Sequence, residues 1–246
     1  MKLIRVADAA QAGKVAAEMI ACQINSDPGC VLGLATGSTP IETYQELIRI
    51  YRQGSVDFSQ VRAVNLDEYI GLGAEHDQSY ARFMRQYLFD HVNIQLSNTY
   101  IPNGLETDPD RECGRYDAVI ESLGGIDLQL LGIGPNGHIG FNEPADTFAK
   151  GTHRVDLTES TITANSRFFE SIDQVPKQAY SMGVQNIMHA RKLLMVATGE
   201  NKARAVRDAF FGDITSWVPA SVLQLHPDFT LIADEAALSL VSGIVE

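Results

Sequence analysis

Hydrophobic and polar positions divide the chain into short apolar runs and longer segments with helical spacing. Lys2 to Val6 forms an apolar run, and Ala7 to Asn25 then repeats apolar residues at intervals of three and four before a break at Asp27-Pro28-Gly29. A short apolar run bounded by turn residues is typical of a buried strand, whereas the three-and-four spacing places apolar residues on one face of a helix. The chain therefore begins with a strand, a helix and a turn.

The same alternation continues along the chain. Five further runs have the pattern of buried strands: Cys30 to Ala35, Val61 to Leu66, Ile126 to Leu131, Leu193 to Ala197 and Phe229 to Ala233. Ser79 is placed to cap a helix over Tyr80 to His91, because a serine side chain accepts hydrogen bonds from free N–H groups at a helix start. Asp108-Pro109 supplies an N-cap and a first-turn proline for a helix that runs toward Leu123.

This order of elements predicts the fold class. Runs that are apolar throughout, such as CVLGLA and IDLQLL, favour a parallel sheet covered by helices on both faces. We expect an α/β fold with a doubly wound, mostly parallel, Rossmann-like sheet. The sequence shows no repeat, low-complexity tract or Gly/Ser linker, which predicts a single domain over residues 1–246. Residues 145–176 are polar and interrupt the alternation, so we expect a helical excursion or a lid that moves over the strand ends.

Composition and charge exclude several classes of protein. The 246 residues are 45% hydrophobic and 20% charged, which is too apolar for a disordered chain. The net charge of -12 disfavours nucleic acid as a partner, and no apolar run approaches the roughly 18 residues that cross a bilayer. Three cysteines without CxxC spacing and the absence of a signal pattern predict a cytoplasmic protein without a disulfide framework.

Four polar loops follow predicted strands and are the candidate site. They are residues 36–39, 65–69, 132–138 and 198–202. Ligands of open α/β sheets bind beyond the carboxyl ends of the strands, where such loops converge. An anionic ligand of this acidic protein would have to be held by local cations and backbone amides.

Thr36, Gly37, Ser38 and Thr39 form the first of these loops, within LGLATGSTP. Their hydroxyl and N–H groups precede a helix, whose positive end attracts phosphate. No GK[ST] follows, so the loop is not that of a nucleoside triphosphatase. An ordinary turn with a helix cap is an equally good interpretation of this loop alone.

Two cations are further candidates for an anion site. Lys202 is predicted in the first turn of a helix, where a positive charge is unfavourable unless an anion lies nearby. Arg167, in NSRFF, is a second candidate anion clamp. A solvated lysine and a surface salt bridge are the alternatives.

Two segments carry candidate acid–base groups. Asp67 and Glu68 follow a buried strand, and their side chains alternate if the strand continues, so one carboxylate faces the cleft and the other takes a structural hydrogen bond. In GIGPNGHIGFNEP, Asn136, His138 and Glu143 share one loop, where a carboxylate can fix the tautomer of the histidine. A structural histidine is the alternative, and a metal site is disfavoured because no ligand spacing supports it.

Six segments taken together resemble the glucosamine-6-phosphate deaminases, in matching order across nearly the whole chain. They are LGLATGSTP, NLDEY, LGIGPNGHIGFNEP, ANSRFF, QVPK and LQLHP. The pairing of NLDEY with NGHIGFNEP distinguishes them from the related 6-phosphogluconolactonases. The resemblance implies a hydrolase acting on carbon–nitrogen bonds, which converts glucosamine 6-phosphate and water to fructose 6-phosphate and ammonia in the catabolism of N-acetylglucosamine, without a cofactor or metal.

The resemblance also implies roles for single residues. Asp67 corresponds to the base that moves a proton from C2 to C1, and His138 to the catalyst of ring opening, oriented by Glu143 and Asn136. Many relatives carry Asp at the position of Asn136, and an amide can hydrogen-bond but contributes no charge. Ser38, Arg167 and Lys202 correspond to phosphate contacts, supported by the amides of Gly37 and Thr39.

Regulation and assembly are less determined by the sequence. Family members that respond to N-acetylglucosamine 6-phosphate use basic and hydroxyl residues after the NEP segment and a longer carboxyl-terminal tail. This chain has Asp146, His153, Val155 and Asp156 there and stops at Glu246, so we expect weak or absent activation. Relatives range from monomers to hexamers, and the sequence decides neither monomer nor homo-oligomer.

Two alternative functions remain open. One is a sugar-phosphate lactonase or isomerase on the same scaffold. The other is a sugar-phosphate sensing domain, which the lack of a helix-turn-helix extension or a basic patch disfavours. A sensor would also not need Asp67, Asn136, His138 and Glu143 together.

Overall fold

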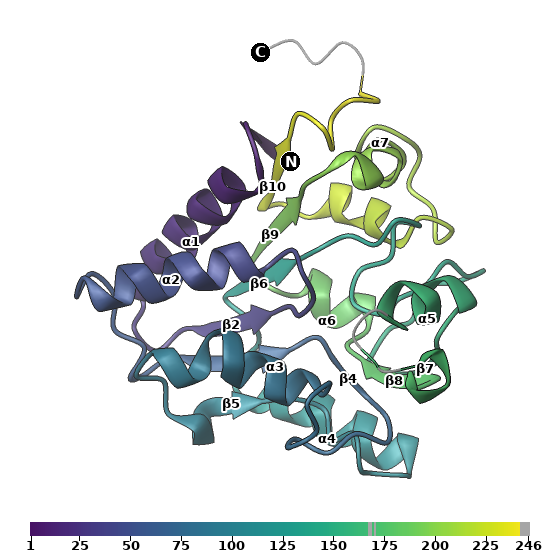
Figure 1. Ribbon diagram of the computed structural model, residues 1–246, viewed down its shortest axis with the longest axis horizontal. Coiled ribbons are helices and arrows are strands. Elements are labelled where there is room, and N and C mark those ends of the chain that lie inside the picture. Colours follow the sequence, from purple (N-terminus) through teal and green to yellow (C-terminus); the bar gives the residue numbers. More distant parts are fainter. Residues whose placement is uncertain (167–168, 170, 242–246) are drawn as a thin grey trace.

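A parallel sheet of seven strands forms the centre of the protein, in a computed structural model that describes residues 1–166, 169 and 171–241 (Figure 1). The strand order is β1-β10-β9-β6-β2-β3-β5, and all neighbouring pairs are parallel. The strands are β1 (Lys2–Val6), β2 (Val31–Leu34), β3 (Arg62–Asn65), β5 (Thr99–Tyr100), β6 (Leu128–Leu131), β9 (Lys192–Ala197) and β10 (Phe229–Asp234). The predicted α/β class and parallel sheet are confirmed.

Helices cover both faces of this sheet. They are α1 (Ala9–Ser26), α2 (Ile41–Arg52), α3 (Tyr80–Tyr87), α4 (Pro109–Ser122), α6 (Val184–Met188) and α7 (Ala203–Phe210). Alternate residues of β2 point to opposite faces, so Leu32 and Leu34 join the apolar cluster of α1, α2 and α3, whereas Val31 joins that of α4, α6 and α7. The doubly wound arrangement is therefore confirmed. None of the helices in the described part of the chain is long and apolar enough to span a membrane.

The strand order reverses direction between β2 and β6. From β2 the chain adds β3 and β5 on one side, and it then returns to add β6, β9 and β10 on the other. The loops that follow β2 and β6 must diverge at this switch point, which leaves a crevice at the carboxyl ends of the strands. The sheet topology thus positions the candidate site.

A second, three-stranded antiparallel sheet was not predicted. It has the order β4-β8-β7, with β4 (Asp67–Tyr69), β8 (Gln178–Ser181) and β7 (His153–Asp156). These strands have three or four residues and lack the apolar runs of the main sheet. Residues 65–69, which we expected to form a loop, therefore end in a strand that pairs Asp67 with Ser181.

Two other expectations are corrected or extended. The helix expected over Tyr80 to His91 ends at Tyr87, because Leu88 leaves helical geometry, and a separate turn of 3₁₀ helix covers Phe89–His91. Residues 145–176 contain β7 as well as the helix α5 (Glu159–Asn165) and the 3₁₀ turn η4 (Ile172–Gln174). The helical part of that expectation is confirmed, and movement as a lid stays a prediction.

Candidate active site

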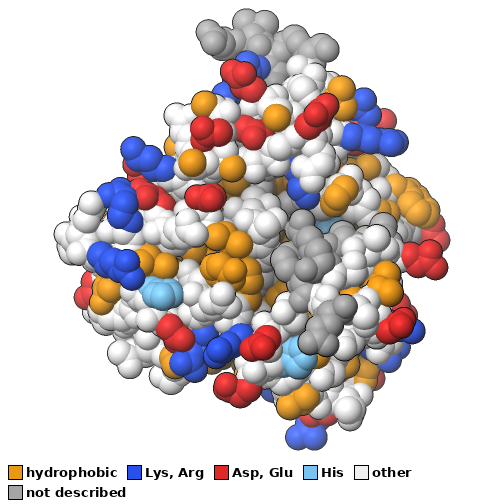
Figure 2. Space-filling view, in the orientation of Figure 1, with side chains coloured by type: hydrophobic (Ala, Val, Ile, Leu, Met, Phe, Trp, Pro, Cys, Tyr) orange, Lys and Arg blue, Asp and Glu red, His pale blue; other side chains and the backbone are white. Residues whose placement is uncertain are grey.

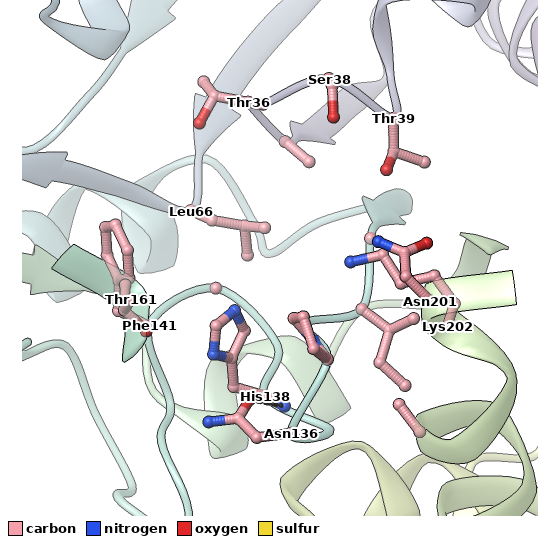
Figure 3. Close-up of a pocket in the computed structure, with 18 of the residues that line it drawn as sticks. Thr36, Ser38, Thr39, Leu66, Asn136, His138, Phe141, Thr161, Asn201 and Lys202 are labelled. Carbon is pink, nitrogen blue, oxygen red and sulfur yellow. Dashed lines mark hydrogen bonds between the residues drawn. The ribbon is translucent and has the colours of Figure 1, made fainter. Parts of the chain in front are cut away.

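A cleft of about 1000 Å³ opens at the carboxyl ends of the parallel strands. All four predicted loops contribute to its lining: Thr36–Thr39 after β2, Leu66 and Asp67 after β3, Gly132–Asn136 and His138 after β6, and Thr198, Asn201 and Lys202 after β9. Figure 3 shows the first of these loops facing His138 across the space, with Asn201 and Lys202 at one end. The four loops follow the adjacent strands β9, β6, β2 and β3, so all of them lie at the switch point or beside it.

The surface of the described residues around the cleft carries no large patch of one charge on the face shown in Figure 2. On the face shown in Figure 2, Lys and Arg side chains are interspersed with Asp and Glu side chains. With a net charge of -12, the molecule as a whole does not attract an anion. An anionic ligand would therefore be bound by groups inside the cleft.

The loop of residues 36–39 presents polar groups to the cleft. Gly37 has a φ of 97°, a left-handed conformation that favours glycine. The N-cap of α2 is Pro40 and makes no side-chain hydrogen bond, so the hydroxyl groups of Ser38 and Thr39 do not cap this helix. Figure 3 shows both hydroxyls directed into the cleft. The interpretation of this loop as a simple helix cap is thus disfavoured.

Lys202 lies at the same end of the cleft as Ser38 and Thr39 (Figure 3). The sequence predicted Lys202 in the first turn of a helix, but it ends the 3₁₀ turn η5 (Glu200–Lys202) and is the N-cap residue that directly precedes α7. The backbone N–H of Gly199 donates to both carboxylate oxygens of Asp234 at 3.0 Å, which fixes this loop to the end of β10. Arg167 lies outside the described residues.

Asp67 is a buried carboxylate that lines the cleft, with 5% of its surface exposed. Burial raises the pKa of Asp67 to about 8, and the negative charge of Glu68 adds to this effect. A Cβ atom at Gly140 would lie 3.3 Å from Oδ2 of Asp67, so the loop that carries His138 passes close to this carboxylate. A proton acceptor and a histidine therefore share one cleft.

Glu68 is not among the residues that line the cleft and has a structural role. Its carboxylate accepts hydrogen bonds of 2.9 Å from the backbone N–H groups of Tyr69, Tyr80 and Ala81. Burial raises the pKa of Glu68 to about 7, against the lowering effect of these bonds. The predicted division between the two neighbouring carboxylates is thus present, with Glu68 anchoring the start of α3. The sequence did not indicate this partner of Glu68, because the hydrogen bond from Tyr80 spans twelve residues.

His138 lines the cleft, and Glu143 lies behind it. Nδ1 of His138 is 3.2 Å from Oε1 of Glu143, without the alignment of a hydrogen bond. A Cβ atom at Gly134 would lie 2.3 Å from Nε2 of His138, so glycine is needed there to make room for the ring. The ring is thus confined between a glycine and a carboxylate.

Glu143 is held by donors on both oxygens. Asn136 Nδ2 donates to Oε2 at 2.6 Å, and Thr161 Oγ1 donates to Oε1 at 2.6 Å. Burial acts to raise the pKa of Glu143, but the contacts with His138, Thr161 and Asn136 lower it below its ordinary value. The group beside His138 is therefore a carboxylate anion at neutral pH.

Sequence reasoning did not single out several residues of the cleft, including Thr161, Tyr80 and Asn201. Thr161 comes from α5, Tyr80 from the start of α3 and Asn201 from the loop after β9. Asn201 belongs to a loop that was predicted, but no spacing in the sequence connects Thr161 with Glu143. Within the described ranges, no group of three or more His, Cys, Asp and Glu side chains is arranged to hold a metal ion.

A family model described as glucosamine-6-phosphate isomerases/6-phosphogluconolactonase matches residues 5–231. The chain belongs to this family. A glucosamine-6-phosphate deaminase of Clostridium perfringens is 53% identical over 241 residues, which cover 98% of this chain and 100% of the relative. One of Clostridioides difficile is 56% identical over 226 residues, which cover 92% of this chain and 91% of the relative.

Solved structures of the glucosamine-6-phosphate isomerase/6-phosphogluconolactonase family agree with this assignment. The structure of a monomeric glucosamine-6-phosphate deaminase matches with a TM-score of 0.95 and 44% identity, covering 98% of this chain and all of that one. A 6-phosphogluconolactonase from Trypanosoma cruzi matches with a TM-score of 0.77 but only 17% identity, covering 98% of this chain and 97% of that one. The lactonase likeness shows a shared fold alone.

Proposed function

We propose that this protein is a glucosamine-6-phosphate deaminase, which converts glucosamine 6-phosphate and water to fructose 6-phosphate and ammonia. The observation that carries this proposal is the placement of buried Asp67 and of His138, backed by Glu143, in one cleft beside a loop suited to phosphate. Relatives that bear this name match nearly the full length of the chain, which supports the same conclusion. The setting is the breakdown of amino sugars.

Substrate binding is assigned to the end of the cleft between the loops after β2 and β9. The phosphate group would accept hydrogen bonds from the Ser38 and Thr39 hydroxyls and from the N–H groups of residues 37–39, and its charge would pair with Lys202. Arg167 remains an expected further contact. Binding energy from the phosphate holds the small sugar in a reactive position, so the dephosphorylated sugar should lose turnover as well as affinity.

Ring opening is assigned to His138. The imidazole of His138 moves a proton from the anomeric hydroxyl of the sugar to the oxygen of the sugar ring. This transfer breaks the bond between C1 and that oxygen and gives the open-chain aldehyde. The Glu143 anion stabilises the imidazolium that forms during this transfer. Asn136 donates to Glu143 and keeps it in place, a role that an amide fills without a charge of its own.

Isomerisation is assigned to Asp67. Its carboxylate removes the proton from C2 and returns it to C1, and a second proton passes from the amino nitrogen to O1, so the aldehyde becomes a primary alcohol and C2 forms an imine. Water then adds to the imine carbon and ammonia leaves, which gives the C2 ketone of fructose 6-phosphate; this last step is hydrolytic. A base whose pKa is raised to about 8 accepts a proton from carbon more readily than an ordinary carboxylate.

We further infer one domain over residues 1–246, movement of residues 145–176 during turnover and a cytoplasmic location. The first two can be tested by amide hydrogen exchange with and without substrate. Uniform, ligand-independent protection of residues 145–176 would contradict their movement.

The proposed reaction is tested by measuring both products from one substrate. Purified protein treated with a chelator is incubated with glucosamine 6-phosphate, and ammonia and fructose 6-phosphate are quantified separately. We expect equal amounts of the two products. A parallel incubation with 6-phosphogluconolactone is the comparison: lactone hydrolysis without ammonia release would favour the lactonase, and sugar-phosphate binding without turnover would favour the sensing domain.

A further inference from the structure

Thr161 connects α5 to the acid–base group of the loop after β6. Its hydroxyl donates to Oε1 of Glu143 at 2.6 Å, across eighteen residues of sequence. The same oxygen lies 3.2 Å from Nδ1 of His138. Thr161 is 5% exposed and lines the cleft, so this hydrogen bond is shielded from bulk water on most sides.

The hydroxyl of Thr161 is itself directed toward Glu143 by its neighbour. Thr158, the N-cap of α5, accepts a hydrogen bond from the backbone N–H of Thr161 at 3.3 Å. Its hydroxyl donates to Oγ1 of Thr161 at 3.0 Å. Because each hydroxyl has one proton to donate, the proton of Thr161 is left for the carboxylate.

Two donors therefore fix the plane of the Glu143 carboxylate. Asn136 holds Oε2 from the same loop as His138, and Thr161 holds Oε1 from a different element. With only one donor, the carboxylate can rotate about the Cγ–Cδ bond of Glu143. Rotation would move Oε1 farther from Nδ1 of His138, which lies 3.2 Å away without hydrogen-bond alignment.

We propose that Thr161 is a positioning residue that holds the Glu143 carboxylate against the ring of His138 during ring opening. The proposal rests on the function proposed above and adds a residue from α5 to the machinery of that reaction. Because Thr161 acts through Glu143, its loss should lower kcat and leave KM nearly unchanged. Substrate binding depends on the loops after β2 and β9, which Thr161 does not touch in the hydrogen bonds described.

The first test removes the hydroxyl while keeping the shape of the side chain. We expect Thr161→Val to lower kcat about tenfold or more, with KM changed less than about twofold, because a hydrogen bond to a charged group is lost. Thr161→Ser, which keeps the hydroxyl, should retain most of the activity. Thr163→Val makes the same change at an exposed position of α5 and should behave as wild type.

The second test asks whether Thr161 acts through Glu143. In a double-mutant cycle, we expect Thr161→Val to have almost no further effect on kcat once Glu143→Gln is present, because the bond it removes no longer orients an anion. A general structural role of Thr161 would instead lower kcat by the same factor in both backgrounds. If valine prevents folding, Thr161→Ser and Thr161→Ala differ by the hydroxyl alone and replace it in the cycle.

Each outcome decides one claim. Wild-type kcat in Thr161→Val, an equal loss in Thr163→Val, or equal factors in the two backgrounds overturns the role of Thr161 while leaving the deaminase function intact. If wild-type protein releases no ammonia from glucosamine 6-phosphate, the proposed function fails, and the role of Thr161 fails with it.

Discussion

Two neighbouring carboxylates in β4 have opposite environments. The Asp67 side chain lines the cleft, whereas Glu68 accepts three backbone N–H groups. Strand alternation alone predicts this division, because successive side chains of a strand point to opposite sides. The sequence could not show which partner Glu68 takes, since that depends on how α3 packs against β4.

Burial of Asp67 should make the stability of the protein depend on pH. Its pKa is raised from 3.8 to about 8, so between these values the folded protein keeps a proton that the unfolded chain has lost. The contribution of Asp67 to stability is therefore present below pH 4, falls as pH rises and is lost above about pH 8. The free energy of unfolding of Asp67→Asn, minus that of wild type, should therefore increase from pH 5 to pH 8 when both are measured by urea unfolding. An equal difference at both pH values would contradict the buried, protonated carboxylate.

Gly134 should be essential for the position of His138. A methyl group there would lie 2.3 Å from Nε2 of the ring and would displace it. We expect Gly134→Ala to reduce kcat about 10²-fold with little loss of stability, since a small misplacement of a catalytic group has effects of that size. Gly114→Ala in α4 is the control, because nothing lies within 4 Å of the added group. Full activity of Gly134→Ala would show that the ring position is not critical.

At the scale of elements, short connections hold the site to the sheet. The loop that carries Lys202 is fixed by Asp234 at the end of β10, which accepts from the N–H groups of Gly199 and Ala237. The position of Lys202 is thus set by a strand that contributes no residue to the lining of the cleft. A search for sequence motifs does not reveal this contact, because Asp234 lies 35 residues along the chain from Gly199.

Asp234→Ala should weaken phosphate binding. Loss of these hydrogen bonds leaves the half-buried N–H of Gly199 and the buried N–H of Ala237 without an acceptor, which costs about 1–3 kcal/mol of stability and frees the loop after β9. We expect KM for glucosamine 6-phosphate and the inhibition constant of inorganic phosphate to rise about tenfold. Asp213→Ala removes an equal charge at an exposed position and should change neither. An unchanged phosphate inhibition constant in Asp234→Ala would separate this loop from the anion site.

The elements that the sequence predicted are those with a strong apolar pattern. The buried strands β2, β6, β9 and β10 were all found within two residues of their ends, as were the N-caps Ser79 and Asp108. The sheet β4-β8-β7 was missed, because its strands are short and carry more polar than apolar residues. Their pairing is decided by tertiary contacts, which override weak local patterns.

At the scale of the whole molecule, the topology brings together residues that are distant in sequence. Asp67, His138 and Lys202 meet in one cleft because their loops leave the same edge of a parallel sheet. That convergence follows from the order of strands and was predictable. Thr161 was not, since its approach to Glu143 depends on the packing of α5, which no sequence pattern specifies.

Regulation is also a property of the whole molecule. The resemblance predicts weak or absent activation by N-acetylglucosamine 6-phosphate, because the chain has Asp146, His153, Val155 and Asp156 in the segment where it departs from the pattern of regulated relatives. Initial rates over a range of glucosamine 6-phosphate, with and without the effector, should give the same half-saturation concentration. A lower value in its presence would contradict this prediction.

The role of Asp67 as the base that moves a proton from C2 to C1 is tested most directly by Asp67→Asn, which keeps the shape of the side chain but cannot accept the proton. Ammonia release is measured at saturating glucosamine 6-phosphate, and binding is measured by calorimetry with the same preparation. We expect binding to persist while turnover falls by about 10²- to 10⁴-fold, the contribution of a positioned general base. Turnover within tenfold of wild type by a folded, substrate-binding Asp67→Asn protein would show that another group removes the proton.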